Sequence, residues 1–377
     1  MSGFTKDTYT KDSIKAIDAK FEAQKIAFAP LTFQAVNALL ELGVLKSISG
    51  SGEKGLTFDE AAEKTGLSVY TVKVLLEIAL GMNIVKTLPP PQPDQEDKYP
   101  CDKDIRFVLG KIGWFLLEDQ MTRINFNFTR DVCYRGAFEL AESARTGKPL
   151  GLKVFGGEEK TIYELLSSLP EQVKESWFAF DHFYSDTGFE EALPIVFANN
   201  PKKIIDIGGN TAKWAIACCR HDPDVEVLIV DLPGQTEAAE QNARKAGFSG
   251  RIKTEAGNVL DEKTIVPSGA DIIWMSQFLD CFSLDEVTAI MKKVRDAAGK
   301  TADIYILEPF WDKQRFEAAA FSLQAASLYF TCMANGNSKM YRYGELAAAI
   351  KKAGFTIVNA RHNLGSNDYS LLHCRGI

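Results

Sequence analysis

Short apolar runs alternate with segments of helical periodicity over the C-terminal half of the chain. The β-branched run Ile204 to Ile207 breaks at a glycine pair, a helix-compatible segment spans Trp214 to Arg220, and a second apolar run spans Val225 to Val230. Short apolar runs bounded by turn residues are typical of buried strands, and apolar residues three and four apart indicate a helix. The pattern therefore predicts a strand, a glycine turn, a helix and a second strand.

The same alternation continues to the C-terminus. Strands are expected at residues 251–256, 271–275, 303–307, 356–361 and 369–374, and helices at 235–246, 284–298 and 343–353. Strands that alternate with helices predict an α/β, doubly wound and mainly parallel sheet, to which the last pair of strands can add in antiparallel fashion.

Polar residues follow several of these strands where the strands end. Gly208, Asp231, Asn258, Gln277 and Glu308 all fall at carboxyl ends, which is where ligands bind in doubly wound sheets. Glycine lets the backbone approach a ligand closely, and an aspartate after the second strand can accept hydrogen bonds from both hydroxyls of a ribose. We therefore expect a nucleoside site.

The glycine turn departs from the dinucleotide-binding pattern. It reads Gly208, Gly209, Asn210, Thr211, Ala212, with asparagine and alanine at positions where further glycines are expected, so no G-x-G-x-x-G motif is present. This disfavours a pyrophosphate cradle, and a glycine turn that only connects two core elements remains the alternative.

The first hundred residues have a different organisation. Apolar residues recur at helical spacing over residues 21–45, Thr57 and Glu60 fit a capping box at the start of a helix, and a second helix is expected over residues 69–80. Residues 83–87 and 98–99 flank a proline-rich tip as two short strands would. Two helices and a hairpin predict a winged helix. Its second helix carries only Lys73 as a cation, which is too little charge for a DNA backbone and favours a dimerisation module.

The region between residues 105 and 199 is expected to be mainly helical. Two aromatic clusters, at residues 112–128 and 177–184, are mostly core. Asp181, His182 and Tyr184 place polar groups in the second cluster, so some of them can line a pocket. The predicted domains are residues 1–110, a helical linker region over 111–200 and the doubly wound domain over 201–377.

Composition narrows the functional class. The 377 residues are 46% hydrophobic and 25% charged with a net charge of −7, as in ordinary soluble proteins, and no basic block favours nucleic acid or a membrane surface. No apolar run approaches the roughly 20 residues of a membrane span, so a cytoplasmic location is expected. Seven scattered cysteines and four histidines form no metal-ligand spacing, so no metal is expected.

With these residues assembled, the chain resembles the S-adenosylmethionine-dependent small-molecule O-methyltransferases, including the caffeate and hydroxyindole enzymes. Residues 205–209, Ile-Asp-Ile-Gly-Gly, look like the family's glycine motif, and Asp231-Leu232-Pro233 is similar to its Asp-Leu-Pro. The resemblance runs from residue 31 to the last strand. It implies a Rossmann-like class I methyltransferase domain, a homodimer formed through the N-terminal domain, S-adenosyl-L-methionine as cofactor, and a small hydroxyl acceptor, aromatic compounds included.

The resemblance also implies roles for particular residues. Gly208 and Gly209 would face the methionine part of the cofactor, Asp231 would hold the ribose, and Asn258, which replaces the family's acid, would stand near the adenine. The remaining residues of the implied cofactor site are Asp206, Leu232, Val259, Ser276 and Gln277.

The catalytic segment differs from that of the family. Asp280, Cys281 and Phe282 stand where the family usually has His-Asp-Trp, whose histidine is the general base. Of the two supporting acids, Glu308 is retained and the other position holds Met340. Asp280 can serve as the base only if its pKa is raised, which apolar neighbours and Glu308 would do. Asp280 as a solvated acid or as the cap of the following helix is the alternative.

Other interpretations remain open. An acceptor that ionises readily needs no strong base, because proximity to the methyl donor supplies most of the rate. The methylating activity can also have been lost or altered, or the chain can be a winged-helix regulator that senses the cofactor. Phe180, His182, Tyr184 and Met340 are expected in the acceptor pocket, with His182 and Tyr184 as possible substitute polar groups.

Overall fold

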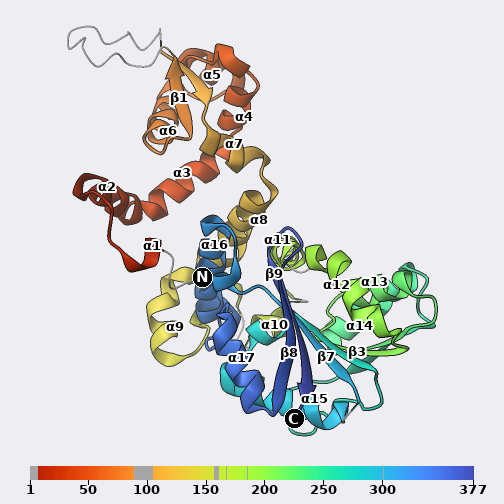
Figure 1. Cartoon of the computed structure of the whole chain (residues 1–377). Helices are drawn as coiled ribbons and strands as arrows, with labels where there is room; N and C mark the ends of the chain where they lie inside the picture. Colours follow the sequence, from red (N-terminus) through yellow and green to blue (C-terminus); the bar gives the residue numbers. More distant parts are fainter. Residues whose placement is uncertain (1–6, 89–104, 157–160, 167, 185, 300) are drawn as a thin grey trace. The chain divides into compact units, whose positions relative to one another are not determined.

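The computed structural model describes residues 7–88, 105–156, 161–166, 168–184, 186–299 and 301–377. These residues form two compact units, Asp7–Phe126 and Asn127–Ile377 (Figure 1). Residues 111–126, which the sequence analysis grouped with the helical linker, belong to the first unit. No helix among the described residues is both long enough and apolar enough to cross a membrane.

A seven-stranded sheet forms the centre of the C-terminal unit, in the order β5-β4-β3-β6-β7-β9-β8. The five strands of this sheet that come first in the sequence pair in parallel, and the last two pair antiparallel with their neighbours. This confirms the doubly wound α/β sheet. The strands are β3 (Lys203–Ile207), β4 (Glu226–Asp231), β5 (Ile252–Ala256), β6 (Ile272–Ser276), β7 (Asp303–Glu308), β8 (Phe355–Leu364) and β9 (Tyr369–Gly376).

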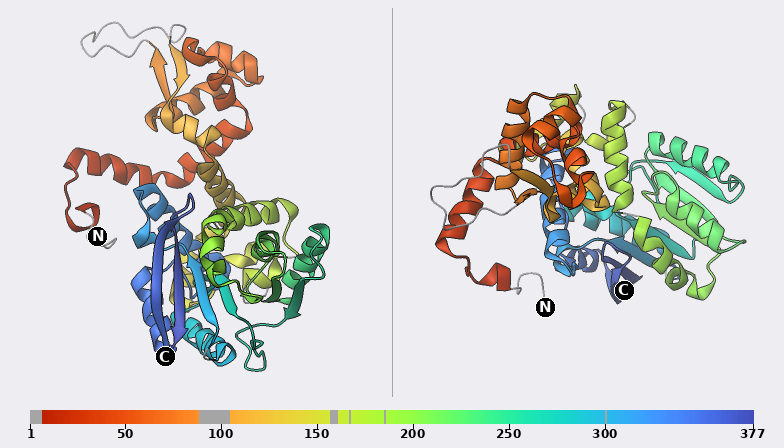
Figure 2. Two further views of the ribbon diagram at one scale, coloured as in Figure 1. Left: turned by 45° about the vertical axis from the view of Figure 1, so that its right-hand side comes forward. Right: turned by 90° about the horizontal axis from the view of Figure 1, so that it is seen from above.

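Helices cover both faces of this sheet (Figure 2). Side chains of successive strand residues point to opposite faces, so Ile205 packs in one core cluster and Ile204 in the other. The first cluster includes residues of α15 (Leu284–Ala298) and α17 (Tyr343–Lys352). The second includes residues of α12 (Phe189–Val196), α13 (Lys213–His221) and α14 (Pro233–Lys245).

A third core cluster joins the remaining helices of this unit. It contains Trp177 of α11 and Tyr329 of α16, whose side chains form a buried hydrogen bond of 2.7 Å from Nε1 to Oη. Phe128 and Phe180 stack in the same cluster with ring centres 3.9 Å apart. Phe128 is the last residue of α8 (Gln120–Phe128), most of which belongs to the first unit. The other helices of this region are α9 (Leu140–Thr146), α10 (Ile162–Leu165), α11 (Glu171–Phe183) and α16 (Glu317–Tyr329).

The N-terminal unit has its own core of helices and one hairpin. The apolar segment over residues 21–45 is interrupted twice, at Pro30 in the first turn of α3 and at Gly43, which has a φ of 73°. The expected capping box is present, since Glu60 N–H donates to Thr57 Oγ1 and Thr57 N–H to Glu60 Oε2. The helices are α1 (Asp7–Thr10), α2 (Ala16–Ala27), α3 (Ala29–Glu41), α4 (Val44–Ser49), α5 (Phe58–Thr65), α6 (Val69–Gly81) and α7 (Lys111–Glu118).

The hairpin differs from the expectation in its second strand. Strand β1 (Val85–Leu88) pairs antiparallel with β2 (Arg106–Leu109), a segment that the sequence analysis assigned to the helical region. The strand expected at residues 98–99 lies outside the described residues. Phe107 explains the pairing, because its side chain is buried against Phe58, with ring centres 4.7 Å apart.

Candidate functional site

A cavity of about 480 Å³ lies over the carboxyl ends of β3, β4 and β6. Its walls combine strand-end residues with aromatic and polar side chains of the helical region. They include Tyr163, Trp177, Asp181, Gly208, Asn210, Asp231, Leu232, Asn258, Val259, Gln277, Phe278, Cys281, Phe282 and Asn335. The cavity therefore lies at the strand ends, where a ligand was expected from the sequence, and most of the implied cofactor residues line it.

The backbone around the cavity adopts left-handed conformations without glycine. Asn210 and Ala212 have φ of 46° and 67°, and Gln277, after β6, has φ of 44°. Such values are uncommon for residues with a side chain, and they concentrate at functional sites. The turn thus adopts, at the two positions where the sequence lacks glycine, the left-handed backbone that glycine favours.

The end of β4 is tied to the glycine turn through Asp231. Its Oδ2 accepts a hydrogen bond from the backbone N–H of Asn210 at 2.8 Å, and its Oδ1 accepts one from Leu232 N–H at 2.7 Å. Burial raises the pKa of Asp231 to about 6, while these two bonds favour its charged form. The carboxylate is held in one orientation at the cavity wall.

A smaller hollow lies beside the glycine turn and contains several polar atoms without partners. It is lined in part by Asp206, Gly209, Asn210, Ser276 and Gln277. Within the described residues, Asp206 Oδ2, Asn210 Oδ1, Ser276 Oγ and Gln277 Oε1 are buried and have no hydrogen-bond partner. Burial and the nearby charge of Asp231 raise the pKa of Asp206 to about 8. Buried polar atoms normally have partners, so this group of atoms indicates a site for a polar ligand.

Asp280 is buried beneath the cavity wall. It lies in a 3₁₀ turn, η8 (Leu279–Cys281), with 6% of its surface exposed, and does not belong to the cavity lining. Its burial raises its pKa to about 6. The alternatives of a solvated acid and of a helix cap are both wrong, because Ser283 caps α15 through a capping box with Glu286.

Glu308, at the end of β7, supports this turn. Its Oε1 accepts backbone hydrogen bonds from Phe278 at 3.1 Å and Leu279 at 2.9 Å. Burial and the neighbouring Asp280 raise its pKa well above the usual value. Glu308 therefore holds the loop that carries Asp280, which agrees with the supporting position that the sequence suggested. Glu308 itself does not line the cavity.

Three of the four residues expected in the acceptor pocket lie outside the lining of the large cavity. Tyr184 and Met340 are buried in the third core cluster, and Phe180 is partly buried and packs against that cluster. Phe180 is covered by Phe128, and Met340 is only 2% exposed. His182 lines the smaller hollow and stacks on Phe178.

Tyr163, Trp177, Cys281 and Asn335 line the cavity although the sequence analysis did not assign them to the pocket. Trp177 was expected to be a core residue, and it is one, since it belongs to the third core cluster and also reaches the cavity wall. Asn335 follows α16, a helix that the sequence analysis did not predict. No local signal in the sequence would have identified it, because its position depends on packing between distant segments.

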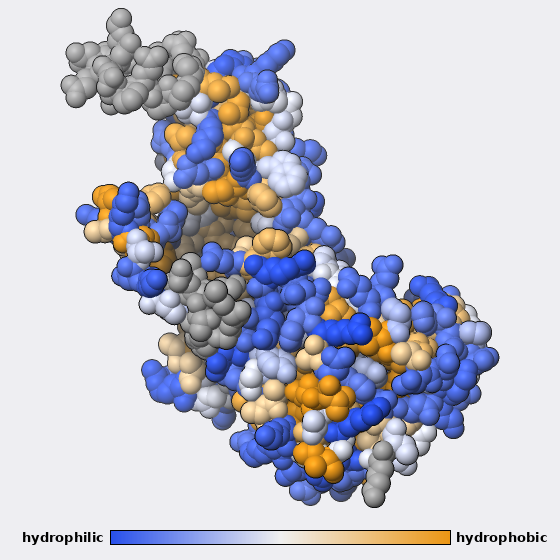
Figure 3. Space-filling view, in the orientation of Figure 1, coloured by the Kyte–Doolittle hydropathy of each residue, from blue (hydrophilic) through white to orange (hydrophobic). Residues whose placement is uncertain are grey.

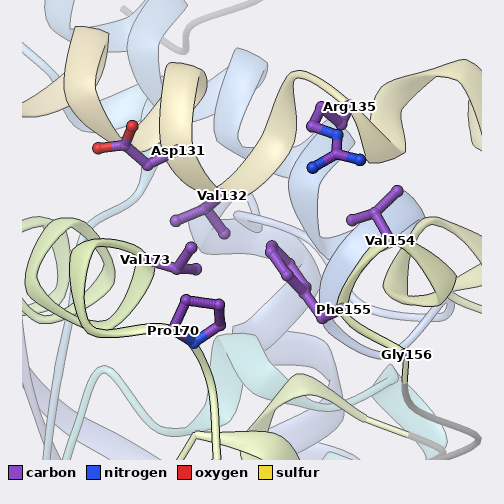
Figure 4. Close-up of a pocket in the computed structure, with 8 residues that line it drawn as sticks. All are labelled: Asp131, Val132, Arg135, Val154, Phe155, Gly156, Pro170 and Val173. Carbon is purple, nitrogen blue, oxygen red and sulfur yellow. The ribbon is translucent and has the colours of Figure 1, made fainter.

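A third space, of about 450 Å³, is separate from the large cavity and the smaller hollow and lies away from the strand ends (Figure 4). Val132, Phe155, Pro170 and Val173 face it, and no strand residue lines it. Asp131 at its edge is already bonded to Arg130 and Ser176. We assign it no role.

Comparison with known proteins identifies the family. A Dimerisation2-like domain matches residues 20–99, and an O-methyltransferase domain matches residues 188–356. Demethylspheroidene O-methyltransferase of Cereibacter sphaeroides is 31% identical over 279 residues, which is 73% of this chain and 66% of that protein. The chain belongs to the S-adenosylmethionine-dependent O-methyltransferase family.

Other relatives of this methyltransferase differ in the atom that they methylate. L-tyrosine C(3)-methyltransferase of Streptomyces lavendulae is 23% identical over 332 residues, which is 88% of this chain and 85% of that protein. The solved structure of the methyltransferase SibL has the same fold, with a TM-score of 0.67 at 21% identity, over 93% of this chain and 98% of SibL. An O-methyltransferase from neocarzinostatin biosynthesis, in complex with S-adenosylmethionine and 2-hydroxy-5-methyl naphthoic acid, has a TM-score of 0.62 at 21% identity, over 92% of this chain and 96% of that one.

The site of the methyltransferase fits S-adenosylmethionine. At Gly209 a Cβ would lie 2.7 Å from Asp206 Oδ2, so any other residue would clash with this carboxyl group. The unpartnered amide oxygens of Asn210 and Gln277 are acceptors, and the cofactor carries an ammonium group that can donate to such atoms. The cofactor of this methyltransferase is S-adenosyl-L-methionine.

Proposed function

We propose that this methyltransferase methylates a small phenolic acceptor that binds in the 480 Å³ cavity next to the cofactor. The observation that carries the proposal is the composition of that cavity. Its wall joins the cofactor residues Gly208 and Asp231 to the aromatic side chains Tyr163, Trp177 and Phe282. Aromatic walls with a few convergent polar groups are typical of sites for flat small molecules.

The cofactor residues have separate proposed roles. Gly208, Gly209 and the oxygens around the smaller hollow hold the methionine part, and Asp231, with Leu232, binds the ribose. Asn258 and Val259 face the adenine end of the same cavity. The side-chain Oδ1 of Asn258 already accepts from Leu260 N–H at 2.9 Å, so its second lone pair remains for an amino group.

Bound S-adenosylmethionine supplies an electrophilic methyl group on a sulfonium. The protein's part is to bind the acceptor beside it, exclude water and remove the proton of the acceptor hydroxyl. Phe278 and Phe282, whose rings are 4.9 Å apart, form an apolar wall that excludes water.

A second candidate is methylation at the ring carbon next to a phenolic hydroxyl. The relative that matches 88% of this chain is named for methylation at a carbon of L-tyrosine. In addition, Asp280 replaces the histidine that the O-methylating members of the family usually have at this position. Both reactions begin with ionisation of the phenol and differ in which atom faces the methyl group.

One experiment tests both candidates. The protein is incubated with S-adenosylmethionine carrying a ¹³C-methyl group and with L-tyrosine, catechol or 1-naphthol as acceptor. Release of S-adenosylhomocysteine and a labelled methyl on oxygen support O-methylation, and a labelled methyl on an aromatic carbon supports the second candidate. Binding of the cofactor without turnover of any of these phenols would contradict the proposed acceptor class.

We also propose that the protein is a homodimer formed through its N-terminal unit. The Dimerisation2-like match supports this, as do large apolar side chains exposed on α2 and α3 (Figure 3). Ile17, Ile26 and Leu31 are each about 70% exposed. Light scattering on the whole chain should give twice the mass of 41.7 kDa, and Ile26→Asp with Leu31→Asp should give the monomer. A monomeric wild-type protein would contradict this proposal.

A further inference from the structure

Asp181 of α11 lies where the large cavity and the smaller hollow meet. Four residues line both spaces: Asp181, Gly208, Asn210 and Gln277. Two of them form the strained cofactor turn and a third follows β6. Asp181 is the only titratable side chain among the four, so it faces the boundary between the methionine part of the cofactor and the acceptor cavity.

One carboxylate oxygen of Asp181 is fixed by the cofactor turn. Oδ2 accepts a hydrogen bond from Asn210 Nδ2 at 3.0 Å, and Nδ1 of His182 lies 3.7 Å from the same atom. Among the described residues, the structure records no donor for Oδ1. A quarter of the side chain remains accessible and the residue lines the cavity, so an acceptor hydroxyl in the cavity can reach this carboxylate.

Asp280 is less well placed for the same task. Its side chain is absent from the cavity lining, whereas Phe278, Cys281 and Phe282 on either side of it are part of the wall. Its Oδ1 accepts a hydrogen bond from Cys281 Sγ at 3.5 Å. Asp280 therefore acts on the cavity through its charge rather than by contact with an acceptor.

The surroundings of Asp181 give it the strength of a base that works near neutral pH. Burial, together with repulsion by Asp186 and Asp280, raises its pKa to about 7, although Lys213 and the bond from Asn210 oppose the rise. A base is most effective when its pKa lies near the working pH. The titratable and charged groups that face Asp181 are His182, Asp186, Lys213, Asp280, Cys281, Tyr329 and Tyr369.

We propose that Asp181 is the general base of methyl transfer and removes the proton from the acceptor hydroxyl. The inference rests on the proposed function and adds the residue that performs this step. The O–H bond breaks and its proton passes to Asp181 Oδ1, while the electron pair of the phenolate, on oxygen or on the adjacent carbon, forms the bond to the methyl carbon. The S–CH₃ bond breaks with its electron pair going to sulfur, which leaves S-adenosylhomocysteine, and Asp181 returns its proton to solvent. For attack at carbon, the ring loses its proton to solvent afterwards.

Asp181→Asn tests the proposal in the full-length protein, because asparagine keeps an oxygen for Asn210 and loses the base. With S-adenosylmethionine and the phenol that the wild-type protein turns over, we expect kcat to fall about 100-fold or more, with unchanged affinity for S-adenosylhomocysteine. The wild-type rate should rise with pH through an apparent pKa near 7, and this rise should vanish in the variant. Glu175→Gln, an exposed carboxylate on the same helix, is the matched control and should leave kcat unchanged.

Asp280→Asn separates the two carboxylates. We expect it to reduce kcat less than tenfold and to shift the pH profile to lower pH, because one source of repulsion on Asp181 is lost. Loss of activity in Asp280→Asn with activity retained in Asp181→Asn would overturn the assignment and leave the proposed function intact.

A second measurement does not require turnover. In the complex with S-adenosylhomocysteine, ¹³C NMR of labelled aspartate carboxyls should show one resonance that titrates near 7 and disappears in Asp181→Asn. Titration of that resonance near the ordinary value of about 3.9 would overturn the proposal even if no phenol is methylated. If the wild-type protein methylates no phenol but Asp181 titrates near 7 as expected, the result would instead count against the proposed function alone.

Discussion

Asp231 and Asn210 are joined by a hydrogen bond of 2.8 Å from the backbone N–H of Asn210 to Oδ2 of the carboxylate. The bond connects the end of β4 to a turn whose backbone is left-handed at Asn210. It fixes the carboxylate and the turn relative to each other before any ligand binds. Preorganisation of this kind lowers the entropic cost of binding.

Replacement of Asp231 should therefore weaken cofactor binding. Its two oxygens accept from two different backbone N–H groups, and the amide of Asp231→Asn can accept at only one of them. We expect the affinity for S-adenosylhomocysteine to fall about 10- to 100-fold, the range for a charge-assisted hydrogen bond of about 1.5–3 kcal/mol. Isothermal titration calorimetry measures it.

Glu226→Gln is the control for this variant, since Glu226 is exposed at the other end of the same strand. It should bind S-adenosylhomocysteine like the wild-type protein. Equal affinities of Asp231→Asn and the wild-type protein would show that Asp231 does not bind the cofactor.

The glycine turn should not tolerate a side chain at Gly208. A Cβ there would lie 2.2 Å from Cδ2 of Phe278, and the φ of 76° adds strain for any other residue. We expect Gly208→Ala to lose most cofactor binding and about 1–3 kcal/mol of unfolding free energy. Gly234→Ala has no atom within 4 Å of the added Cβ and should leave both quantities near the wild-type values. Similar behaviour of the two variants in calorimetry and thermal unfolding would refute the steric argument.

The stability of the ligand-free protein should fall as the pH rises from about 4 to about 8. Asp206 has a pKa of about 8 in the folded protein and about 3.9 when unfolded. Between these values the folded state holds a proton that the unfolded state has lost, so the unfolding free energy decreases with increasing pH. The melting temperature should be lower at pH 8.5 than at pH 6.

The Asp206→Asn variant provides the control for this effect, because an amide does not titrate. Its melting temperature should change less over the same pH interval. A decrease of the same size in both proteins would assign the effect to other buried carboxyls, such as Asp181 or Glu308.

The hydrogen bond between Trp177 and Tyr329 should stabilise the wall of the acceptor cavity. Both residues are largely buried, and the bond from Nε1 to Oη measures 2.7 Å. Trp177→Phe and Tyr329→Phe each leave a buried polar group without its partner, at a cost of about 1–3 kcal/mol. In a double-mutant cycle followed by urea unfolding, we expect the double variant to cost clearly less than the sum of the single variants. Additive costs would mean that the bond contributes nothing, and Tyr70→Phe, at an exposed tyrosine, should be neutral.

The sequence by itself determined the sheet, its winding and the polar strand ends that line the cavity. Runs such as Ile204 to Ile207 and the turn that follows depend on local preferences, so they can be identified without knowledge of their neighbours. Asp231 could be placed for the same reason, because the end of a parallel strand fixes the edge of the sheet at which its side chain lies. Even the absent glycines at positions 210 and 212 mattered little, since asparagine and alanine adopt the required backbone there.

Only the tertiary structure decided which side chains face the acceptor. Asp280 and Asp181 both stand in apolar sequence surroundings, and the packing of α11 against the strand ends is what places Asp181 in the cavity wall and leaves Asp280 behind it. The pairing of β1 with β2 and the position of Asn335 likewise depend on contacts between segments that are distant in the sequence. Such contacts have no local periodicity, because they arise from the shapes of several elements packed together.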